Sequence, residues 1–139
     1  MGPIHQEQVC YTLYSTSNVI THAYRSLLEP LKLTYPQFVV MMALLQKDRV
    51  SVTELAEAVG LKKPTMTPLL KRLETLGYIT REFEAGDERQ KCIALTPLGQ
   101  SLADAVDDVA RKALCATGLS SDEAELLISL CQKIKLELT

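Results

Sequence analysis

The sequence predicts a mainly α-helical fold with one small β-hairpin. Apolar residues recur at helical spacing through most of the chain. Helix starts and stops are marked by Ser or Thr followed by Glu three residues on, and by single glycines. Short runs typical of strands occur only within residues 78–95. With 139 residues, the chain is expected to form a single domain, residues 1–139.

The composition favours a folded protein outside the membrane. The chain is 47% apolar and 23% charged with a net charge of −2, whereas disorder goes with low hydrophobicity and high net charge. Its longest strictly apolar run, residues 38–45, is far shorter than the roughly 20 residues that span a membrane. No basic start leads into an apolar segment, so no secretory signal is predicted. We therefore expect a cytoplasmic protein that does not act at a membrane.

The first two helices are predicted over residues 6–28 and 36–46. Apolar side chains at helical spacing define the first helix. Pro36 suits the first turn of the second helix, with Thr34 or Tyr35 as its entry. The second helix is apolar on nearly all sides, so we expect it to be buried.

The next segment predicts two helices joined by a tight turn. Ser51 and Glu54 match a capping box, and Gly60 stops the short helix that follows. A second helix is predicted over residues 63–76, with an apolar stripe on one side. Pro68 indicates either a late start of this helix or a kink in its first turn, and both alternatives stay open.

A β-hairpin is predicted to follow the two helices. Its strands cover residues 78–83 and 90–95, and the charged residues 84–89 form a long connecting loop. A helical pattern returns at Pro97, which suits a first helical position, and stops at Gly118.

The last helix begins at a capping box formed by Ser120 and Glu123. The terminal segments, residues 1–35 and 97–139, carry apolar stripes that flank the middle unit on both sides. These stripes leave apolar surface uncovered in one chain, and pairing with a second copy would bury it. We therefore expect the terminal segments to form a helical dimerisation lobe.

Basic residues are concentrated in the middle of this acidic chain. Residues 61–81 contain five basic side chains and a single acidic one, Glu74. A local basic patch of this kind indicates contact with a polyanion. From the charge alone, a solvated helix face is the favoured explanation.

The order of elements over residues 36–96 is that of a winged helix-turn-helix. In this architecture the second helix enters the major groove of DNA, and a charged hairpin reaches the neighbouring minor groove. Basic and hydroxyl side chains then bind phosphates or base edges, and Asp87 would orient Arg89 at the wing tip. The predicted DNA contacts are Lys63, Thr65, Thr67, Lys71, Arg72, Asp87 and Arg89.

Five short motifs follow one another in order along the chain: Glu54-Leu55-Ala56, Thr67-Pro68-Leu69-Leu70-Lys71-Arg72-Leu73-Glu74, Gly77-Tyr78-Ile79-Thr80-Arg81, Asp87-Glu88-Arg89 and Leu95-Thr96-Pro97-Leu98-Gly99. With these motifs the sequence resembles the MarR family of transcriptional regulators. The resemblance runs over nearly the whole chain and implies a homodimeric winged-helix repressor that binds palindromic double-stranded DNA. It implies no enzyme activity and no cofactor.

The N-terminal half contains three further segments: Cys10-Tyr11-Thr12-Leu13-Tyr14-Ser15, Tyr24-Arg25-Ser26-Leu27-Leu28 and Leu33-Thr34-Tyr35-Pro36-Gln37. With these segments it resembles, within the family, the OhrR branch of organic-hydroperoxide sensors. The resemblance implies that Cys10 is oxidised to a sulfenic acid, that Tyr24 and Tyr35 bind it through hydrogen bonds, and that Tyr14 lines the site.

Helix geometry agrees with a site that spans two subunits. A thiolate is favoured in the first turn of a helix, where Cys10 is predicted to lie, and Tyr14 follows it by one helical turn. Tyr24 lies 14 residues further on, which is about 21 Å along a helix. Contact between Tyr24 and Cys10 therefore requires a partner subunit. The alternative is that Cys10 is a small buried apolar residue, as free cysteines often are.

The resemblance to two-cysteine members of this branch implies an intersubunit disulfide between Cys10 and Cys115. Sulfenic acids condense with thiols in this way, and a Cα separation above about 7 Å would require movement first. Cys92 and Cys131 are expected in the core, although Cys131 remains an alternative resolving thiol.

Three other functions are alternatives to a hydroperoxide sensor. A regulator of this family responding to a small aromatic ligand would use Cys10 only for packing. A metal sensor is disfavoured because the chain has only two histidines, His5 and His22, far apart in the sequence. A thiol peroxidase is disfavoured because no thioredoxin-like alternation of strands and helices is present.

Overall fold

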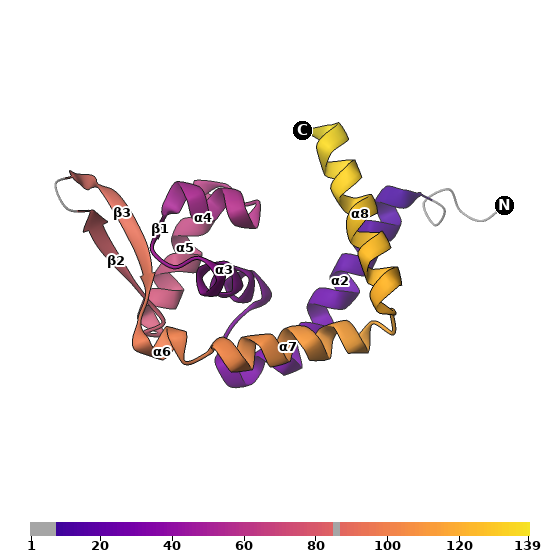
Figure 1. Cartoon of the computed structure of the whole chain (residues 1–139), viewed down its shortest axis with the longest axis horizontal. Coiled ribbons are helices and arrows are strands. Elements are labelled where there is room, and N and C mark those ends of the chain that lie inside the picture. Colours follow the sequence, from indigo (N-terminus) through magenta and orange to yellow (C-terminus); the bar gives the residue numbers. More distant parts are fainter. Residues whose placement is uncertain (1–7, 85–86) are drawn as a thin grey trace.

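A computed structural model describes residues 8–84 and 87–139, and the side chains of these residues apart from 83–91. The chain is mostly helical with a small antiparallel sheet, as predicted (Figure 1). The elements are α2 Val9–Leu28, the 3-10 turn η1 Glu29–Leu31, α3 Tyr35–Gln46, β1 Val50–Ser51, α4 Val52–Val59, α5 Lys63–Thr75, β2 Ile79–Glu84, β3 Asp87–Leu95, α6 Pro97–Gln100, α7 Ala103–Ala116 and α8 Ser121–Leu138.

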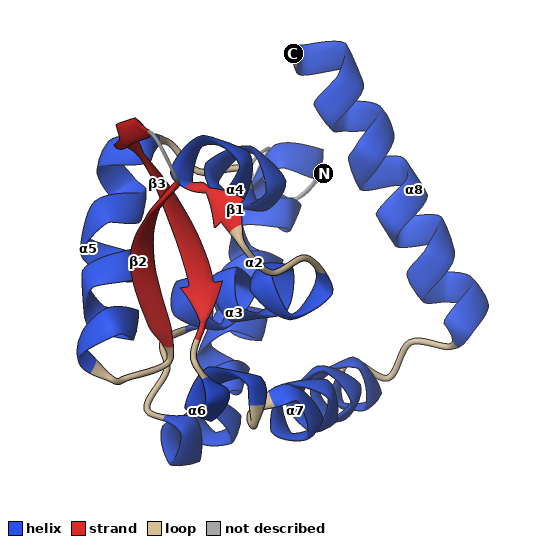
Figure 2. Cartoon of the chain, turned by 60° about the vertical axis from the view of Figure 1, so that its left-hand side comes forward, coloured by secondary structure: helices blue, strands red, loops and turns tan. Residues whose placement is uncertain are grey.

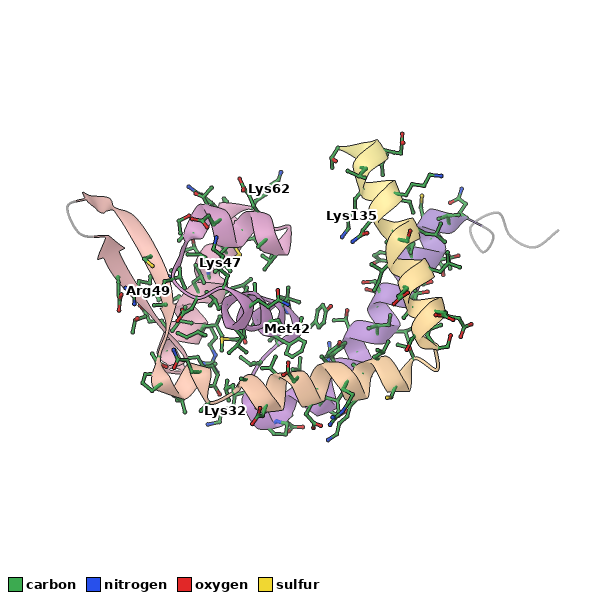
Figure 3. All side chains as sticks on the ribbon, in the orientation of Figure 1. Lys32, Met42, Lys47, Arg49, Lys62 and Lys135 are labelled. Carbon is green, nitrogen blue, oxygen red and sulfur yellow. The ribbon has the colours of Figure 1, made fainter. Side chains whose placement is uncertain are left out.

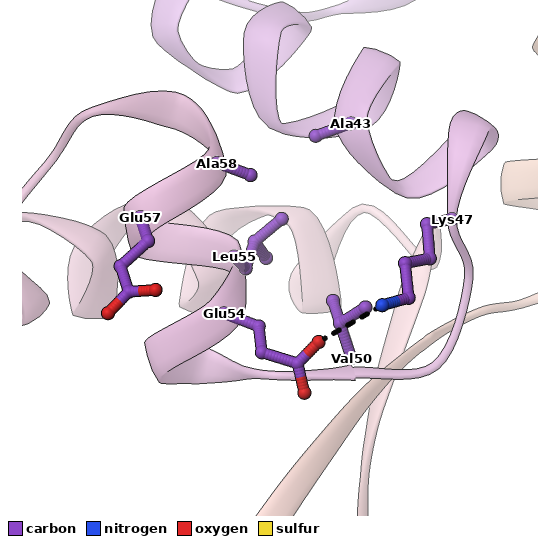
Figure 4. Close-up of a pocket in the computed structure, with 7 residues that line it drawn as sticks. All are labelled: Ala43, Lys47, Val50, Glu54, Leu55, Glu57 and Ala58. Carbon is purple, nitrogen blue, oxygen red and sulfur yellow. Dashed lines mark hydrogen bonds and ion pairs between the residues drawn. The ribbon is translucent and has the colours of Figure 1, made fainter.

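The helix-turn-helix of α4 and α5 begins at the predicted cap. The Ser51 hydroxyl oxygen accepts a hydrogen bond from the backbone N–H of Glu54 at 3.1 Å. The Glu54 carboxylate pairs with Lys47 at 3.4 Å (Figure 4), so the expected capping box is only half formed. Gly60 has a φ of 74°, a left-handed conformation that suits glycine, and it ends α4 as predicted.

Helix α5 settles the position of Pro68. The helix begins at Lys63, so Pro68 lies inside it. At the sixth helical position a proline removes a hydrogen bond that would otherwise go to the carbonyl of Pro64. Met66, Leu70 and Leu73 are buried on the inner side of the helix, as the apolar stripe predicted.

The sheet is larger than predicted. Its order is β1-β3-β2 with antiparallel pairing throughout. The two residues of β1 escaped prediction because so short a strand has no visible alternation. The predicted loop over residues 84–89 was wrong, because β3 already begins at Asp87. Charged residues are typical of loops, but here the backbone of residues 87–89 forms part of a strand.

The long helix predicted from Pro97 was also wrong, because it is divided into α6 and α7. A Cβ at Gly99 would collide with the carbonyl oxygen of Tyr78, so only glycine lets α6 pack against the base of the hairpin. The Thr96 hydroxyl oxygen accepts from Gly99 N–H at 3.0 Å and caps this short helix. Helix α7 then runs toward the other end of the molecule (Figure 1).

The core is built around α3, α5 and the sheet. Phe38, Val40, Met41 and Leu44 of α3 are completely buried, as the apolar character of this helix predicted. In contrast, α8 has no buried residue. Figure 2 shows α8 set apart from the other helices, joined to α7 by a short loop.

Candidate DNA interface and thiol site

Helix α5 presents a polar face opposite its buried stripe. The five side chains predicted to contact DNA from this helix are all exposed: Lys63, Thr65, Thr67, Lys71 and Arg72. Alternation of buried and exposed positions follows from the helical period, so one amphipathic helix both anchors itself and offers a basic surface.

The cations of α5 have no carboxylate partners in the described part of the chain. The ion pairs found there join Lys47 to Glu54, Arg49 to Glu82, and both Arg111 and Lys112 to Asp108. Lys63, Lys71 and Arg72 therefore remain available for phosphates. The threonine hydroxyls of α5 are partly engaged within the helix, since Thr67 donates to the carbonyl of Lys63 at 3.3 Å.

The hairpin is attached to the rest of the protein by residues that the sequence did not reveal. Arg49 pairs with Glu82 of β2 at 2.6 Å, and Figure 3 shows it beside the hairpin. One oxygen of Asp48 accepts from the N–H groups of both Arg49 and Leu95, each at 2.8 Å. Arg49 has a φ of 60°, which is uncommon outside glycine. No pattern in the sequence indicates this backbone conformation or the contact with Glu82.

The predicted wing contacts Asp87 and Arg89 belong to β3. Their side chains lie outside the described residues. Their roles at the wing tip stay predictions.

Cys10 lies where the sequence placed it. It is the second residue of α2, and its side chain is exposed. Tyr14, one turn further along, is 67% exposed. The interpretation of Cys10 as a buried apolar residue does not hold for the single chain, because both side chains face outward.

Tyr24 and Tyr35 meet in an aromatic cluster with Phe38. The ring centroids of the two tyrosines are 4.8 Å apart, and Tyr24 lies 5.5 Å from Phe38. Burial, reinforced by the nearby Tyr35, raises the pKa of Tyr24 above its ordinary value. Its phenol therefore keeps its proton over a wide pH range and remains a hydrogen-bond donor.

The single chain does not bring Cys10 to this tyrosine pair. Helix α2 is continuous from Val9 to Leu28, so Cys10 and Tyr24 are separated by about 21 Å along its axis. The structure unites Tyr24 with Tyr35 and leaves Cys10 with Tyr14 at the opposite end of α2.

The other cysteines differ in their surroundings. Cys115 is exposed near the end of α7, and Cys92 is buried in β3, as predicted. Cys131 was expected in the core, but it is only half-buried. The reason is that α8 packs too little against the described part of the chain to bury any of its residues.

The uncovered apolar surface is concentrated on the terminal helices. Exposed large apolar side chains occur on α2, α7 and α8, including Val19, Leu114, Leu126, Ile128 and Leu136. A pocket of about 400 Å³ lies between these helices. It is lined by residues that include Thr16, Val19, Ile20, Tyr24, Leu119 and Leu127.

The described residues offer neither a metal site nor a membrane-spanning helix. No group of three or more His, Cys, Asp and Glu side chains that could hold a metal ion occurs within the described residues. Among the helices described, none is both long and apolar enough to cross a membrane.

Comparisons with known proteins agree with this geometry. Residues 33–91 match the model of the MarR family. The transcriptional regulator TtmR of Methylorubrum extorquens strain PA1 is 38% identical over 121 residues, which are 87% of this chain and 62% of TtmR. The chain thus spans less than two thirds of that relative. The organic hydroperoxide resistance transcriptional regulator of Bacillus subtilis strain 168 is 36% identical over 120 residues, covering 86% of this chain and 80% of that protein.

A solved relative places the fold on DNA. Reduced AbfR bound to DNA is 28% identical with a TM-score of 0.80, covering 96% of this chain and 93% of AbfR. AbfR, a protein of Staphylococcus epidermidis, has also been solved overoxidized on DNA and in a disulfide form. The sequence relatives, the winged helix-turn-helix and the unpaired basic face of α5 lead to one identification: the chain belongs to the MarR family and is a DNA-binding transcriptional regulator.

Proposed function

We propose that this chain is a homodimeric repressor that senses organic hydroperoxides through Cys10. In the reduced state the dimer binds a palindromic operator. Oxidation of Cys10 leads to a disulfide with Cys115 of the other subunit, and the affinity for DNA falls. The observation that carries the proposal is that Cys10 lies exposed at one end of α2, whereas Tyr24 pairs with Tyr35 toward the other end.

A dimer is the arrangement that joins the two halves of this site. The family is dimeric, and the terminal segments 1–35 and 97–139 carry the uncovered apolar side chains that a dimer would bury. If α2 packs antiparallel to its copy, Cys10 of one subunit meets Tyr24 and Tyr35 of the other. The phenolic O–H groups of the two tyrosines then donate hydrogen bonds to the thiolate and stabilise it.

The chemistry needs the Cys10 thiol, the Cys115 thiol of the other subunit and the oxidant. The Cys10 thiolate attacks the outer oxygen of the hydroperoxide, the O–O bond breaks, and the alkoxide takes up a proton and leaves as an alcohol. The product is a sulfenic acid. The Cys115 thiol of the partner then attacks this sulfur, an S–S bond forms, and the hydroxyl group leaves as water.

The choice of Cys115 as the resolving thiol is supported by its exposure. Cys92 is buried in the sheet and inaccessible to another subunit, whereas Cys115 is exposed on α7. A crosslink between α2 and α7 of different subunits would pull on the helix that leads directly into α6 and the hairpin. This route offers a mechanical path from the thiol to the DNA-binding surface.

The proposal is tested by a non-reducing gel and intact mass, before and after one equivalent of cumene hydroperoxide. Wild type should form a crosslinked dimer that disappears in Cys10→Ser and in Cys115→Ser. Cys131→Ser is the matched control, because Cys131 lies on another dimerisation helix and should leave the crosslink intact. A crosslink that persists in Cys115→Ser would contradict the assignment of the resolving thiol.

The same measurement decides whether Cys10 senses oxidant at all. A mass gain of one oxygen without a crosslink would indicate a one-cysteine sensor. Unchanged mass, together with unchanged DNA binding at fixed salt, would refute oxidation of Cys10 as the signal.

A second candidate function is favoured by the pocket of about 400 Å³ beside Tyr24. An apolar pocket of this size suits a small aromatic ligand, which would make this chain a ligand-responsive regulator. In that case a small aromatic acid such as salicylate should release DNA from Cys10→Ser as readily as from wild type, and cumene hydroperoxide should have no effect on either protein.

A further inference from the structure

Arg81 stands on the inner side of the hairpin. In β2 it pairs with Ile93 of β3, and Ile79, two residues earlier, is on the same face of the sheet. Both isoleucines are buried. Arg81 therefore points toward α5, where its Nη2 donates to the carbonyl of Thr67 at 3.5 Å. Its neighbour Glu82 lies on the other face and pairs with Arg49.

The guanidinium of Arg81 is poorly satisfied by the described part of the chain. Its Nε is buried and has no hydrogen-bond partner there. Among the described residues, its one hydrogen bond goes to a neutral carbonyl, at the distance limit for such a bond. No carboxylate pairs with it among the described residues, in contrast to Arg49 and Arg111.

A half-buried cation of this kind is costly without a counterion. Loss of water around the guanidinium is compensated only by hydrogen bonds or by an opposite charge. The first turns of α5 add positive charge to the same neighbourhood, through Lys63 and the N-terminal end of the helix dipole. The local potential therefore attracts an anion, and DNA is the anionic ligand of this family.

We propose that Arg81 binds a DNA backbone phosphate at the junction of the recognition helix α5 and the hairpin. The carbonyl of Thr67 and the packing of Nε against the protein fix the orientation of the guanidinium, and its remaining N–H groups are free to bind the phosphate. The neutral-carbonyl bond is too weak to hold Arg81 for a purely structural purpose. This contact adds affinity and carries no sequence information.

The inference rests on the DNA-binding function and not on the thiol chemistry, so the experiment uses protein kept reduced. Fluorescence anisotropy measures the affinity for a mixed-sequence duplex of about 30 base pairs, at salt concentrations between about 50 and 200 mM. A second duplex, obtained by selection from random sequence with wild type, serves as the specific ligand. The variants are Arg81→Met and Arg81→Lys, and Arg111→Met on α7 is the control that removes an equal charge elsewhere.

For Arg81→Met we expect about a tenfold or larger loss of affinity at low salt on both duplexes, since a hydrogen bond to a charged group contributes about 1.5–3 kcal/mol. The slope of log affinity against log salt should flatten by about 0.9 for each arginine removed, or about 2 for a dimer. Arg81→Lys should retain most of the slope, because the charge remains. Arg111→Met should match wild type on both duplexes.

Two results would overturn the proposal. An unchanged salt slope in Arg81→Met, with affinity lost only on the selected duplex, would mean that Arg81 merely positions α5. Unchanged affinity on both duplexes would mean that the phosphate is bound elsewhere. Thermal unfolding separates these results from misfolding, because removing an unpaired cation should not lower the melting temperature of Arg81→Met.

Discussion

The DNA-binding elements and the terminal helices differ in how much of their apolar surface is buried within a single chain. Helices α3 and α5 bury their apolar stripes within one chain, together with the sheet. Helix α8 has 18 residues and buries none of them, and α2 has 20 residues and buries only Leu28. The first set of elements therefore buries its apolar stripes within a single chain, whereas the terminal helices leave stripes that a second copy would cover in the proposed dimer.

This difference bears on how a thiol could control DNA binding. Helices α4 and α5 are anchored by side chains buried within one chain, so we expect their packing not to depend on a partner. In the proposed dimer, the spacing between the two DNA-binding surfaces would depend instead on α2, α7 and α8. A chemical change at Cys10 or Cys115 would then act on the helices that set this spacing.

The largest expected effect on stability comes from a substitution in the core that is buried within a single chain. Phe38 is fully buried and packs against Tyr24 and Tyr35. Phe38→Ala should lower the free energy of unfolding by about 3–5 kcal/mol, because it removes a large aromatic side chain and leaves a cavity. Chemical denaturation measures this loss. A change that grows or shrinks with protein concentration would contradict a core that is complete within one chain.

A smaller effect is expected on α8, and only where a dimer is present. Leu130 is 49% exposed in the single chain. Leu130→Ala should weaken dimerisation by about 2 kcal/mol per subunit, the lower end of the range for buried leucines. Analytical ultracentrifugation over a dilution series measures the dissociation constant. Glu125→Ala on the same helix is the control, and an equal effect of both variants would argue against an apolar α8 interface.

The contrast between the two halves also explains how far the sequence could be interpreted. Ser51, Gly60 and Ser120 marked helix ends correctly, because caps and left-handed glycines act locally. The break between α6 and α7 could not be predicted, because it depends on contact of Gly99 with the backbone of Tyr78. Local patterns thus predict where helices form, whereas the break between α6 and α7 near Ser101 depends on tertiary contact.

The candidate sites show the same limit. The exposed basic face of α5 followed from the helical period of the sequence, and so did the position of Cys10 in the first turn of α2. The Arg49–Glu82 pair and the inward direction of Arg81 were missed, because both depend on the register of β2 against β3. The expected burial of Cys131 was wrong because an apolar stripe does not say whether its partner lies in the same chain.

A third prediction sharpens the role of the tyrosine cluster. Tyr24→Phe keeps the ring contacts with Tyr35 and Phe38 but removes the phenolic donor. If that donor stabilises the Cys10 thiolate of the partner, oxidation by cumene hydroperoxide should slow by about tenfold, the equivalent of one hydrogen bond to a charged group. Stopped-flow detection of sulfenic acid gives the rate. Tyr14→Phe is the comparison, and unfolding of both variants should match wild type.

The smallest expected effect concerns the cap of α8, where a helix without buried residues depends on local interactions. Ser120 accepts from Glu123 N–H at 3.1 Å, and the Glu123 carboxylate accepts from Ser120 N–H at 2.9 Å. The backbone N–H of Ser120, followed by the Ser120 side chain, holds the pKa of the Glu123 carboxyl below its ordinary value. Because the folded pKa is lowered, the stabilisation is present above the unfolded pKa and is lost as the pH falls through the folded value.

Two variants separate the contributions to this cap. Ser120→Ala should destabilise α8 by about 1 kcal/mol at neutral pH. Glu123→Gln keeps an acceptor oxygen without the charge, so its α8 should be slightly less stable than wild type at neutral pH and equal to it in acid. Hydrogen exchange at the amides of the first turns of α8, followed from about pH 6 down to pH 3, measures both effects. Identical pH profiles for wild type and Glu123→Gln would show that the charge of the carboxylate contributes nothing to the cap.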